Sequence, residues 1–194
     1  MKRTATISRK TKETEIAVTV NLDGTGAASV STGIGFLDHM LGALAKHSGI
    51  DISLACKGDL HIDDHHTAED CALALGQAID QALGDRRGIA RYGFAYAPLD
   101  ESLARAVLDF SGRPCSVANL MLTREKVGEL AVENVPHVFR SLATASRMTL
   151  HVDVIRGEND HHKSEAAFKA LALALKQAVA LTTSTEIPST KGTL

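Results

Sequence analysis

A short histidine-rich pattern occurs twice in this chain, and its recurrence restricts the fold more than any other feature. Residues 63–70 read DDHHTAED and residues 159–166 read NDHHKSEA, so both stretches contain HHxxE. Each copy follows strands, a helix with one further histidine, and another strand, so the repeat extends well beyond the motif. The sequence therefore predicts two homologous half-domains, residues 1–90 and 91–194, that form one compact unit.

Hydrophobic periodicity assigns helices and strands in the same order to both halves. In the first half we expect strands at 15–23, 27–31 and 50–58 and helices at 36–49 and 63–84. In the second half we expect strands at 91–100, 103–112, 115–120 and 148–157 and helices at 134–146 and 159–181. Glycines between the first two strands predict that these strands pair as a hairpin. Helices that alternate with strands indicate an α/β (α+β) fold, in which helices cover one face of each sheet.

The charge balance and the cysteine pattern exclude several classes of function. The 194 residues include 21 basic and 23 acidic side chains, giving a net charge of −2, which argues against nucleic acid or an anionic membrane as the main partner. No apolar run approaches the ~18 residues of a membrane span, and residues 1–10 lack an apolar signal core, so we expect a cytoplasmic location. Cys56, Cys71 and Cys115 form no CxxC pair, which predicts small buried side chains rather than disulfides.

The two HHxxE copies are the strongest candidates for a metal site. Positions i and i+4 share a helix face, so His65 can point together with Glu69, and His161 with Glu165. Adjacent histidines point about 100° apart, so one copy of the motif could contribute to two metal ions. The pattern is not HExxH, so nothing supports a zinc protease. Imidazole together with carboxylate suits Zn, Mn, Fe, Co or Ni.

A third imidazole for each site comes from the shorter predicted helices. His39 and His137 occupy equivalent positions in the two halves, 26 and 24 residues before the first histidine of the motif. The candidate metal ligands are therefore His39, His65, His66, Glu69, His137, His161, His162 and Glu165. Six histidines and two glutamates divide into two sites of three histidines and one glutamate each.

Basic and hydroxyl side chains at the end of the second half suggest an anion-binding site. The segment IPSTKG at residues 187–192 offers the hydroxyl of Ser189 and the cation of Lys191, although it is not a P-loop. Arg113 lies in a predicted turn, Arg91 follows the junction between the halves, and Lys169 lies one helical turn after the second HHxxE. Cations that converge near a metal favour a phosphorylated substrate.

Several ordered motifs resemble those of the imidazoleglycerol-phosphate dehydratase family of histidine biosynthesis. They are TKETEI (11–16), NLDGTG (21–26), GFLDHML (35–41), DDHHTAED (63–70), SGRP (111–114), DHHKSEAAFKA (160–170) and IPSTKG (187–192). The resemblance covers essentially the whole chain, without an additional phosphatase domain, and so implies the monofunctional form. It implies dehydration of D-erythro-imidazole-glycerol phosphate to imidazole-acetol phosphate. It also implies that each half is a four-stranded sheet with two helices on one face.

The resemblance further implies the roles of the site residues. The eight candidate ligands would hold two Mn²⁺ ions per active site, with their division between the metals left open. Glu13, from TKETEI, would be the acid–base carboxylate. The substrate phosphate would be bound by Arg91, Arg113, Lys169, Ser189 and Lys191. The expected assembly is a 24-subunit homo-oligomer with active sites between subunits.

The dehydration explains why a metal is needed, because the proton to be removed lies beside an imidazole ring and is barely acidic. A metal-bound ring nitrogen would favour loss of the ring N–H, and the resulting imidazolate could expel the neighbouring hydroxyl. Glu13 would then transfer protons. Two alternatives stay open from the residues: a dinuclear metallohydrolase of a phosphorylated metabolite, and a non-catalytic metal-binding shell protein.

Overall fold

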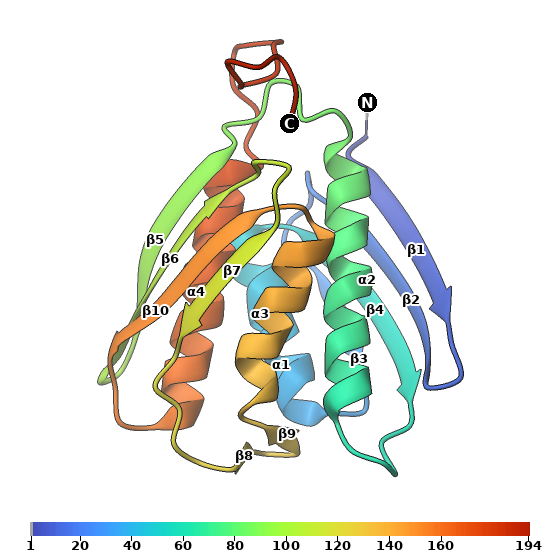
Figure 1. Ribbon diagram of the computed structural model, residues 1–194, viewed down its shortest axis with the longest axis vertical. Helices are drawn as coiled ribbons and strands as arrows, with labels where there is room; N and C mark the ends of the chain where they lie inside the picture. The colour runs from blue at the N-terminus through green and yellow to red at the C-terminus, as the bar shows by residue number, and fades with distance from the viewer. Residues whose placement is uncertain (1) are drawn as a thin grey trace.

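Four helices fill the space between two four-stranded sheets in the computed structural model, which describes residues 2–194 (Figure 1). The first half contains β1 (Thr4–Lys10), β2 (Thr14–Asn21), β3 (Ala28–Ser31), α1 (Gly35–Ser48), β4 (Asp51–Gly58) and α2 (His65–Leu83). The second half contains β5 (Tyr92–Leu99), β6 (Ser102–Asp109), β7 (Cys115–Asn119), α3 (Asn134–Ala145), β10 (Thr149–Arg156) and α4 (Asp160–Ala178). A short ribbon joins β7 to α3 and consists of β8 (Lys126–Val127) and β9 (Leu130–Ala131).

The predicted α/β class is confirmed, with two helices on one face of each four-stranded sheet. Both sheets have the same strand order. In each half the last long strand lies between the second and the third, which gives β1-β2-β4-β3 and β5-β6-β10-β7. Alternate residues of β2 and β6 are buried, and these inward side chains pack against the helices. The division at residue 90 stays a prediction, although the repeated strand order fits it.

The edge strand β1 was not predicted, and neither was the short ribbon of β8 and β9. Only Ala5 of the seven residues of β1 is buried, so its sequence lacks the apolar alternation that identifies a half-buried strand. This edge strand is instead defined by its antiparallel pairing with β2, which runs from Thr4 opposite Asn21 to Lys10 opposite Glu15. Backbone pairing of this kind leaves little trace in the side-chain pattern.

The predicted hairpin between the strands at 15–23 and 27–31 is wrong, because β3 pairs in parallel with β4. The carboxylate of Asp51, the first residue of β4, explains the difference. It accepts backbone hydrogen bonds from Thr25 (2.7 Å) and Ala27 (2.9 Å), and so holds the connecting loop across the start of β4. The loop therefore carries the chain to the far side of β4 rather than turning it back on β2.

All four helices begin at the same end of the molecule, the lower end in Figure 1. For α1 and α3 this direction follows from the parallel pairs β3–β4 and β7–β10, because the helix between two parallel strands must run back across the sheet. The HHxxE copies occupy the first turns of α2 and α4, so both lie at this end. Further along the helices, α2 and α3 pack closely: a Cβ on Gly76 of α2 would approach the carbonyl oxygen of Leu142 in α3 to 2.7 Å.

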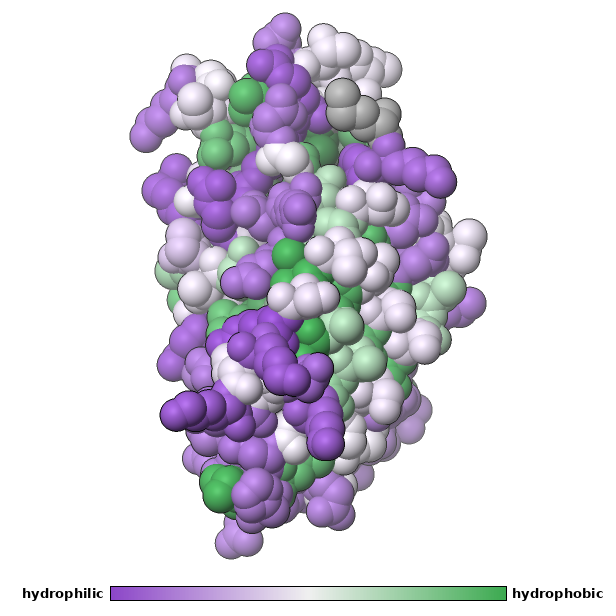
Figure 2. All heavy atoms as spheres, turned by 90° about the vertical axis from the view of Figure 1, so that its right-hand side faces the viewer, coloured by the Kyte–Doolittle hydropathy of each residue, from purple (hydrophilic) through white to green (hydrophobic). Residues whose placement is uncertain are grey.

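The outer faces of the two sheets differ in character. Small side chains such as Thr6 and Thr19, which hydrogen-bond to each other at 2.9 Å, cover the first sheet. Figure 2 shows this side of the molecule, with pale and light-green residues across its middle and purple hydrophilic residues around them. The second sheet instead exposes large rings, including Phe94, which is 66% exposed, and its neighbours Tyr92 and Tyr96.

The burial of each cysteine depends on where its side chain lies in the fold. Cys71 is buried as expected, and Cys56 is only half-buried. The predicted burial of Cys115 is wrong, because Cys115 begins β7 and is exposed. Within residues 2–194, no helix combines the length and the apolar character that crossing a membrane requires.

Candidate metal and active site

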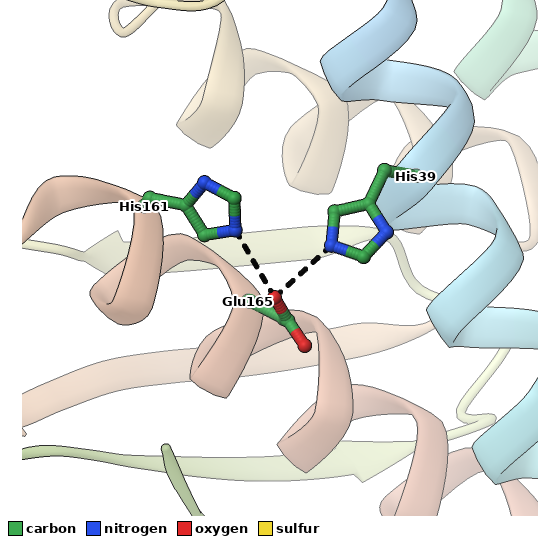
Figure 3. Close-up of side chains that lie close together, drawn as sticks. All are labelled: His39, His161 and Glu165. Carbon is green, nitrogen blue, oxygen red and sulfur yellow. Dashed lines mark hydrogen bonds and ion pairs between the residues drawn. The ribbon is translucent and has the colours of Figure 1, made fainter. Parts of the chain in front are cut away.

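The first cluster of predicted ligands joins α1 to α4. Oε2 of Glu165 lies 3.1 Å from Nε2 of His39 and 3.2 Å from Nε2 of His161, and the three ligand atoms lie within 4.8 Å of one another (Figure 3). His161 and Glu165 share a face of α4, as their i,i+4 spacing predicts, and α1 packs against α4 to bring His39 to them. One carboxylate oxygen therefore faces two imidazole nitrogens.

The second cluster joins α2 to α3 in the same manner. Oε1 of Glu69 lies 3.2 Å from Nε2 of His137, and the rings of His65 and His137 stack with their centroids 4.8 Å apart. Nδ1 of His65 is 3.0 Å from the side-chain oxygen of Asn134. Although Oε1 of Glu69 is close, the two atoms are not aligned for a hydrogen bond, so the buried Nε2 of His137 has no hydrogen-bond partner within residues 2–194. A buried nitrogen without a partner, beside a carboxylate and a second imidazole, fits a divalent metal ion.

Each cluster takes its ligands from both halves of the repeat. His39 of the first half joins Glu165 of the second, and His137 of the second half joins Glu69 of the first. Within this chain each cluster holds two histidines and one glutamate, rather than the three histidines and one glutamate that we expected. His66 and His162 lie outside the clusters because adjacent residues of a helix point in different directions.

Carboxylates surround these two remaining histidines. Nδ1 of His66 lies 3.0 Å from Asp59, and its Nε2 lies 3.8 Å from Oε1 of Glu13, the predicted acid–base residue. Nδ1 of His162 lies 2.7 Å from Glu101. Hydrogen bonding to Asp59 raises the pKa of His66, and hydrogen bonding to Glu101 likewise raises the pKa of His162. Sequence analysis missed both acids, since Asp59 lies in the loop before α2 and Glu101 lies 61 residues before its histidine.

Lys169 lies at the first cluster and not with the other predicted phosphate ligands. Its Nζ is 2.6 Å from Oε1 of Glu165, and it leaves Oε2 of that carboxylate to the histidines. Burial raises the pKa of Glu165, but hydrogen bonds from Lys169 and His39 outweigh this effect and bring it to about 2. The glutamate is therefore ionised at neutral pH, as a metal ligand must be.

The other four predicted phosphate ligands line one hollow of about 570 Å³: Arg91, Arg113, Ser189 and Lys191. The guanidinium of Arg91 is already engaged, since it donates to both oxygens of Asp109 (2.6 and 3.0 Å) and to the carbonyl oxygen of Pro188 (2.7 Å). This pairing with Asp109 raises the pKa of Arg91. The hollow therefore combines one cation held by Asp109 with further cations and hydroxyls that suit an anion.

The hollow and the clusters lie at opposite ends of α4. The backbone N–H of Arg91 donates to the carbonyl oxygen of Ala178, the last residue of α4 (2.9 Å), whereas His161 lies in its first turn. His161 and Ala178 lie 17 residues apart along the helix, or about 25 Å. Figure 1 shows the C-terminal tail at the upper end, beyond the last turn of α4.

A duplicated α/β sandwich with two histidine–glutamate clusters and a basic hollow defines a class of metal-binding enzyme for phosphorylated substrates. A family model described as imidazoleglycerol-phosphate dehydratase matches residues 32–175. The chain belongs to the imidazoleglycerol-phosphate dehydratase family, whose members are metal-dependent.

Individual relatives are similar over almost their whole length. A protein of Phaffia rhodozyma named imidazoleglycerol-phosphate dehydratase is 58% identical, over 99% of this chain and 96% of its own. A protein of Cereibacter sphaeroides with the same name is 57% identical, over 99% of this chain and 100% of its own. The crystal structure of the Staphylococcus aureus dehydratase matches with a TM-score of 0.83 and 38% identity, over 92% of this chain and 99% of its own. The Pyrococcus furiosus structure, solved in complex with (S)-C348, matches with a TM-score of 0.83 and 34% identity, over 97% of this chain and 100% of its own.

Proposed function

We propose that the chain is a metal-dependent hydro-lyase that converts D-erythro-imidazole-glycerol phosphate to imidazole-acetol phosphate in histidine biosynthesis. The observation that carries this function is the pair of clusters, in each of which two imidazoles and a carboxylate lie within 4.8 Å of one another. The basic hollow supports a phosphorylated substrate, since cations and hydroxyls suit a phosphate group. Family membership supports the particular reaction.

Two Mn²⁺ ions per active site are part of this proposal. Their ligands would be His39, His65, His66, Glu69, His137, His161, His162 and Glu165. Imidazole nitrogen and carboxylate oxygen are donors that Mn²⁺ accepts, although the same set would also bind other divalent metals. When bound, the metal acts as a Lewis acid on the substrate.

The active site is proposed to lie between subunits. About 25 Å of helix separates the clusters of one chain from its own phosphate hollow, and the glycerol chain of the substrate is far shorter than that. The hollow of one copy would therefore serve the clusters of another, and the outlying His66 and His162 would complete clusters of neighbouring copies. The exposed rings of the second sheet, such as Phe94, favour association. We propose a 24-subunit homo-oligomer in the cytoplasm.

The chain's own residues would position the substrate and move its protons. Arg113, Ser189 and Lys191 would hold the phosphate, with Arg91 kept in place by Asp109. Holding the phosphate at one end orients the reacting carbons, which can contribute several kcal/mol. The carboxylate of Glu13 would take up and return protons at those carbons.

A direct assay separates this function from its rivals. Purified protein supplied with Mn²⁺ is incubated with the imidazole substrate, and the ketone product and inorganic phosphate are both measured. Formation of the ketone with the phosphate ester intact is expected. Release of inorganic phosphate would instead indicate a metallohydrolase. If neither product forms, the remaining explanation is a non-catalytic metal-binding shell protein.

Replacing one histidine in each cluster should remove metal selectively. In His39→Asn or His137→Asn, the affected cluster keeps only one imidazole and the carboxylate from its own chain, so bound Mn²⁺ should fall to about half of the wild-type content. Metal content after dialysis against a fixed Mn²⁺ concentration provides the measurement. His47→Asn is the matched control, because His47 lies in the last turn of α1, far from the cluster end. Unchanged metal content in both cluster variants would contradict the proposed ligands.

The phosphate hollow should contribute mainly to binding. Arg113→Gln removes a cation that lines the hollow, and loss of a charged hydrogen bond of ~1.5–3 kcal/mol should raise KM about 10- to 100-fold. Inhibition by inorganic phosphate should weaken in parallel. Arg87→Gln is the control, since Arg87 is exposed and pairs with Asp85 (2.8 Å). An unchanged KM would place the substrate phosphate elsewhere.

A further inference from the structure

The second histidine of each HHxxE copy has a carboxylate at the same ring nitrogen. Nδ1 of His66 lies 3.0 Å from Oδ2 of Asp59, and Nδ1 of His162 lies 2.7 Å from Oε2 of Glu101. The first histidines differ, because Nδ1 of His65 meets the neutral side-chain oxygen of Asn134. A carboxylate at Nδ1 is therefore found at the two histidines that lie outside the clusters of their own chain, whereas His65 has a neutral acceptor there.

The two halves supply this carboxylate from different elements. Asp59 lies in the loop between β4 and α2, seven residues before His66. Glu101 lies in the turn between β5 and β6, 61 residues before His162. The repeat has thus kept the contact while changing the element that makes it. A contact that two unlike loops both make is difficult to explain as a by-product of the duplicated fold.

Each carboxylate is suited to hold its histidine. Oε1 of Glu101 accepts hydrogen bonds from the backbone N–H groups of Glu158 (3.1 Å) and Asn159 (2.9 Å), which leaves Oε2 directed at His162. Oδ1 of Asp59 is buried without a partner among residues 2–194, so His66 is the group that this carboxylate meets. Neither side chain is free to leave its histidine without losing a hydrogen bond.

A carboxylate at Nδ1 determines which nitrogen of the imidazole carries the proton and which one is free to bind a metal. A neutral imidazole carries its proton on one nitrogen and a lone pair on the other. A carboxylate accepts only, so it places the proton on Nδ1 and leaves the lone pair on Nε2. Such a partner also increases the basicity of a ligating histidine and fixes the orientation of its ring.

We propose that Asp59 and Glu101 are positioning residues that hold His66 and His162 with the proton on Nδ1 and present Nε2 as a metal ligand. The inference rests on the proposed function, which assigns these histidines to the metal sites. It adds two residues that act through a histidine and touch neither metal nor substrate. Removing either should weaken metal binding about 10- to 100-fold without unfolding the chain.

A double-mutant cycle tests whether Asp59 affects Mn²⁺ binding through His66. Mn²⁺ affinity is measured by titration calorimetry for the wild type, Asp59→Ala, His66→Ala and the double variant. We expect Asp59→Ala to bind Mn²⁺ about 10- to 100-fold more weakly, and to have no further effect once His66 is replaced. Equal weakening in both backgrounds, or wild-type affinity in Asp59→Ala, would overturn the proposal. Wild-type protein that binds no Mn²⁺ would instead overturn the proposed function.

The protonation pattern of the ring can be measured without any metal. Long-range ¹H–¹⁵N spectra of ¹⁵N-histidine-labelled metal-free protein report which ring nitrogen carries the proton. His66 and His162 should both be protonated on Nδ1, and Asp59→Ala should abolish this preference for His66 alone. A lone proton on Nε2 in the wild type would overturn the proposal whatever the Mn²⁺ affinities are.

The second half offers a control with the same change of charge. Glu101→Gln should weaken Mn²⁺ binding, whereas Glu158→Gln should leave it at the wild-type value, because Glu158 meets Glu101 only through its backbone N–H. Urea unfolding of all variants confirms that each is folded. Equal effects of the two substitutions would mean that nearby negative charge, and not the hydrogen bond to His162, determines the affinity.

Discussion

Replacing Glu13 with glutamine is expected to lower kcat by about 10²- to 10⁴-fold while folding and bound metal stay unchanged. The side chain lies in the turn between β1 and β2, is 52% exposed, and reaches His66 at 3.8 Å. It supports no core contact, so its loss should not destabilise the chain. An amide has nearly the same shape as the carboxylate but cannot accept the substrate proton. Turnover, Mn²⁺ content and urea unfolding together provide the measurement.

A matched control lies two residues further along the chain. Glu15 has the same charge, but its carboxylate pairs with Lys10 at 2.7 Å on the outer surface of the sheet. Glu15→Gln should therefore keep wild-type turnover. Near-normal kcat in Glu13→Gln would remove Glu13 from the reaction, and loss of bound metal in that variant would show a structural role instead.

Asp160→Asn is expected to destabilise the folded chain by about 3–5 kcal/mol, the usual result of leaving one partner of a buried ion pair alone. The carboxylate is fully buried at the first residue of α4, directly before the second HHxxE motif. Oδ1 lies 2.7 Å from Nζ of Lys163, and Oδ2 accepts the backbone N–H groups of Thr123 (2.7 Å) and Arg124 (2.6 Å). Equilibrium unfolding in urea measures the loss.

Two companion variants show whether the buried charge is the cause. Adding Lys163→Met to Asp160→Asn removes the unpaired cation and should restore much of the lost stability. The first half offers a natural comparison, because Asp64 has Thr67 where Asp160 has Lys163, so Asp64→Asn should cost clearly less. Equal losses at both aspartates, or no rescue by Lys163→Met, would contradict the explanation.

The contribution of Asp160 should also depend on pH. Burial raises the pKa of Asp160, but the ammonium of Lys163 and two backbone N–H groups outweigh this and bring it to about 2, below its ordinary value of 3.8. Stability from a group with a lowered pKa is complete above the unfolded value and is lost as the pH falls through the folded value. The difference between wild type and Asp160→Asn should therefore be constant near neutrality and shrink between about pH 4 and pH 2.

Local patterns predicted much of the fold, and long-range pairing accounts for what they missed. The i,i+4 spacing within one helix was enough to place His161 beside Glu165. It could not show that His39 would join them, since that contact depends on which helices pack together. The hairpin prediction failed for a similar reason, because the carboxylate of Asp51 determines the course of a loop 26 residues earlier in the chain.

The same limit applies to the acids around the outlying histidines. Glu101 lies 61 residues from His162, and no periodicity links the two positions. The family resemblance named the phosphate ligands, and four of them line one hollow. Neither the resemblance nor the spacing indicated that this hollow would lie at the far end of α4 from the clusters. The length of α4 separates the tail from the clusters, and tertiary topology brings Arg91 and Arg113 to the tail.

The separation of hollow and clusters along α4 has a consequence for enzymology. If the imidazole ring and the phosphate of the substrate are bound by different copies of the chain, an isolated protomer has no activity even when it is fully folded. Specific activity should then decline on dilution below the concentration at which copies dissociate. Mixing two inactive variants, one damaged in the hollow at Arg113 and one in a cluster at His39, should recover part of the rate through hybrid assemblies.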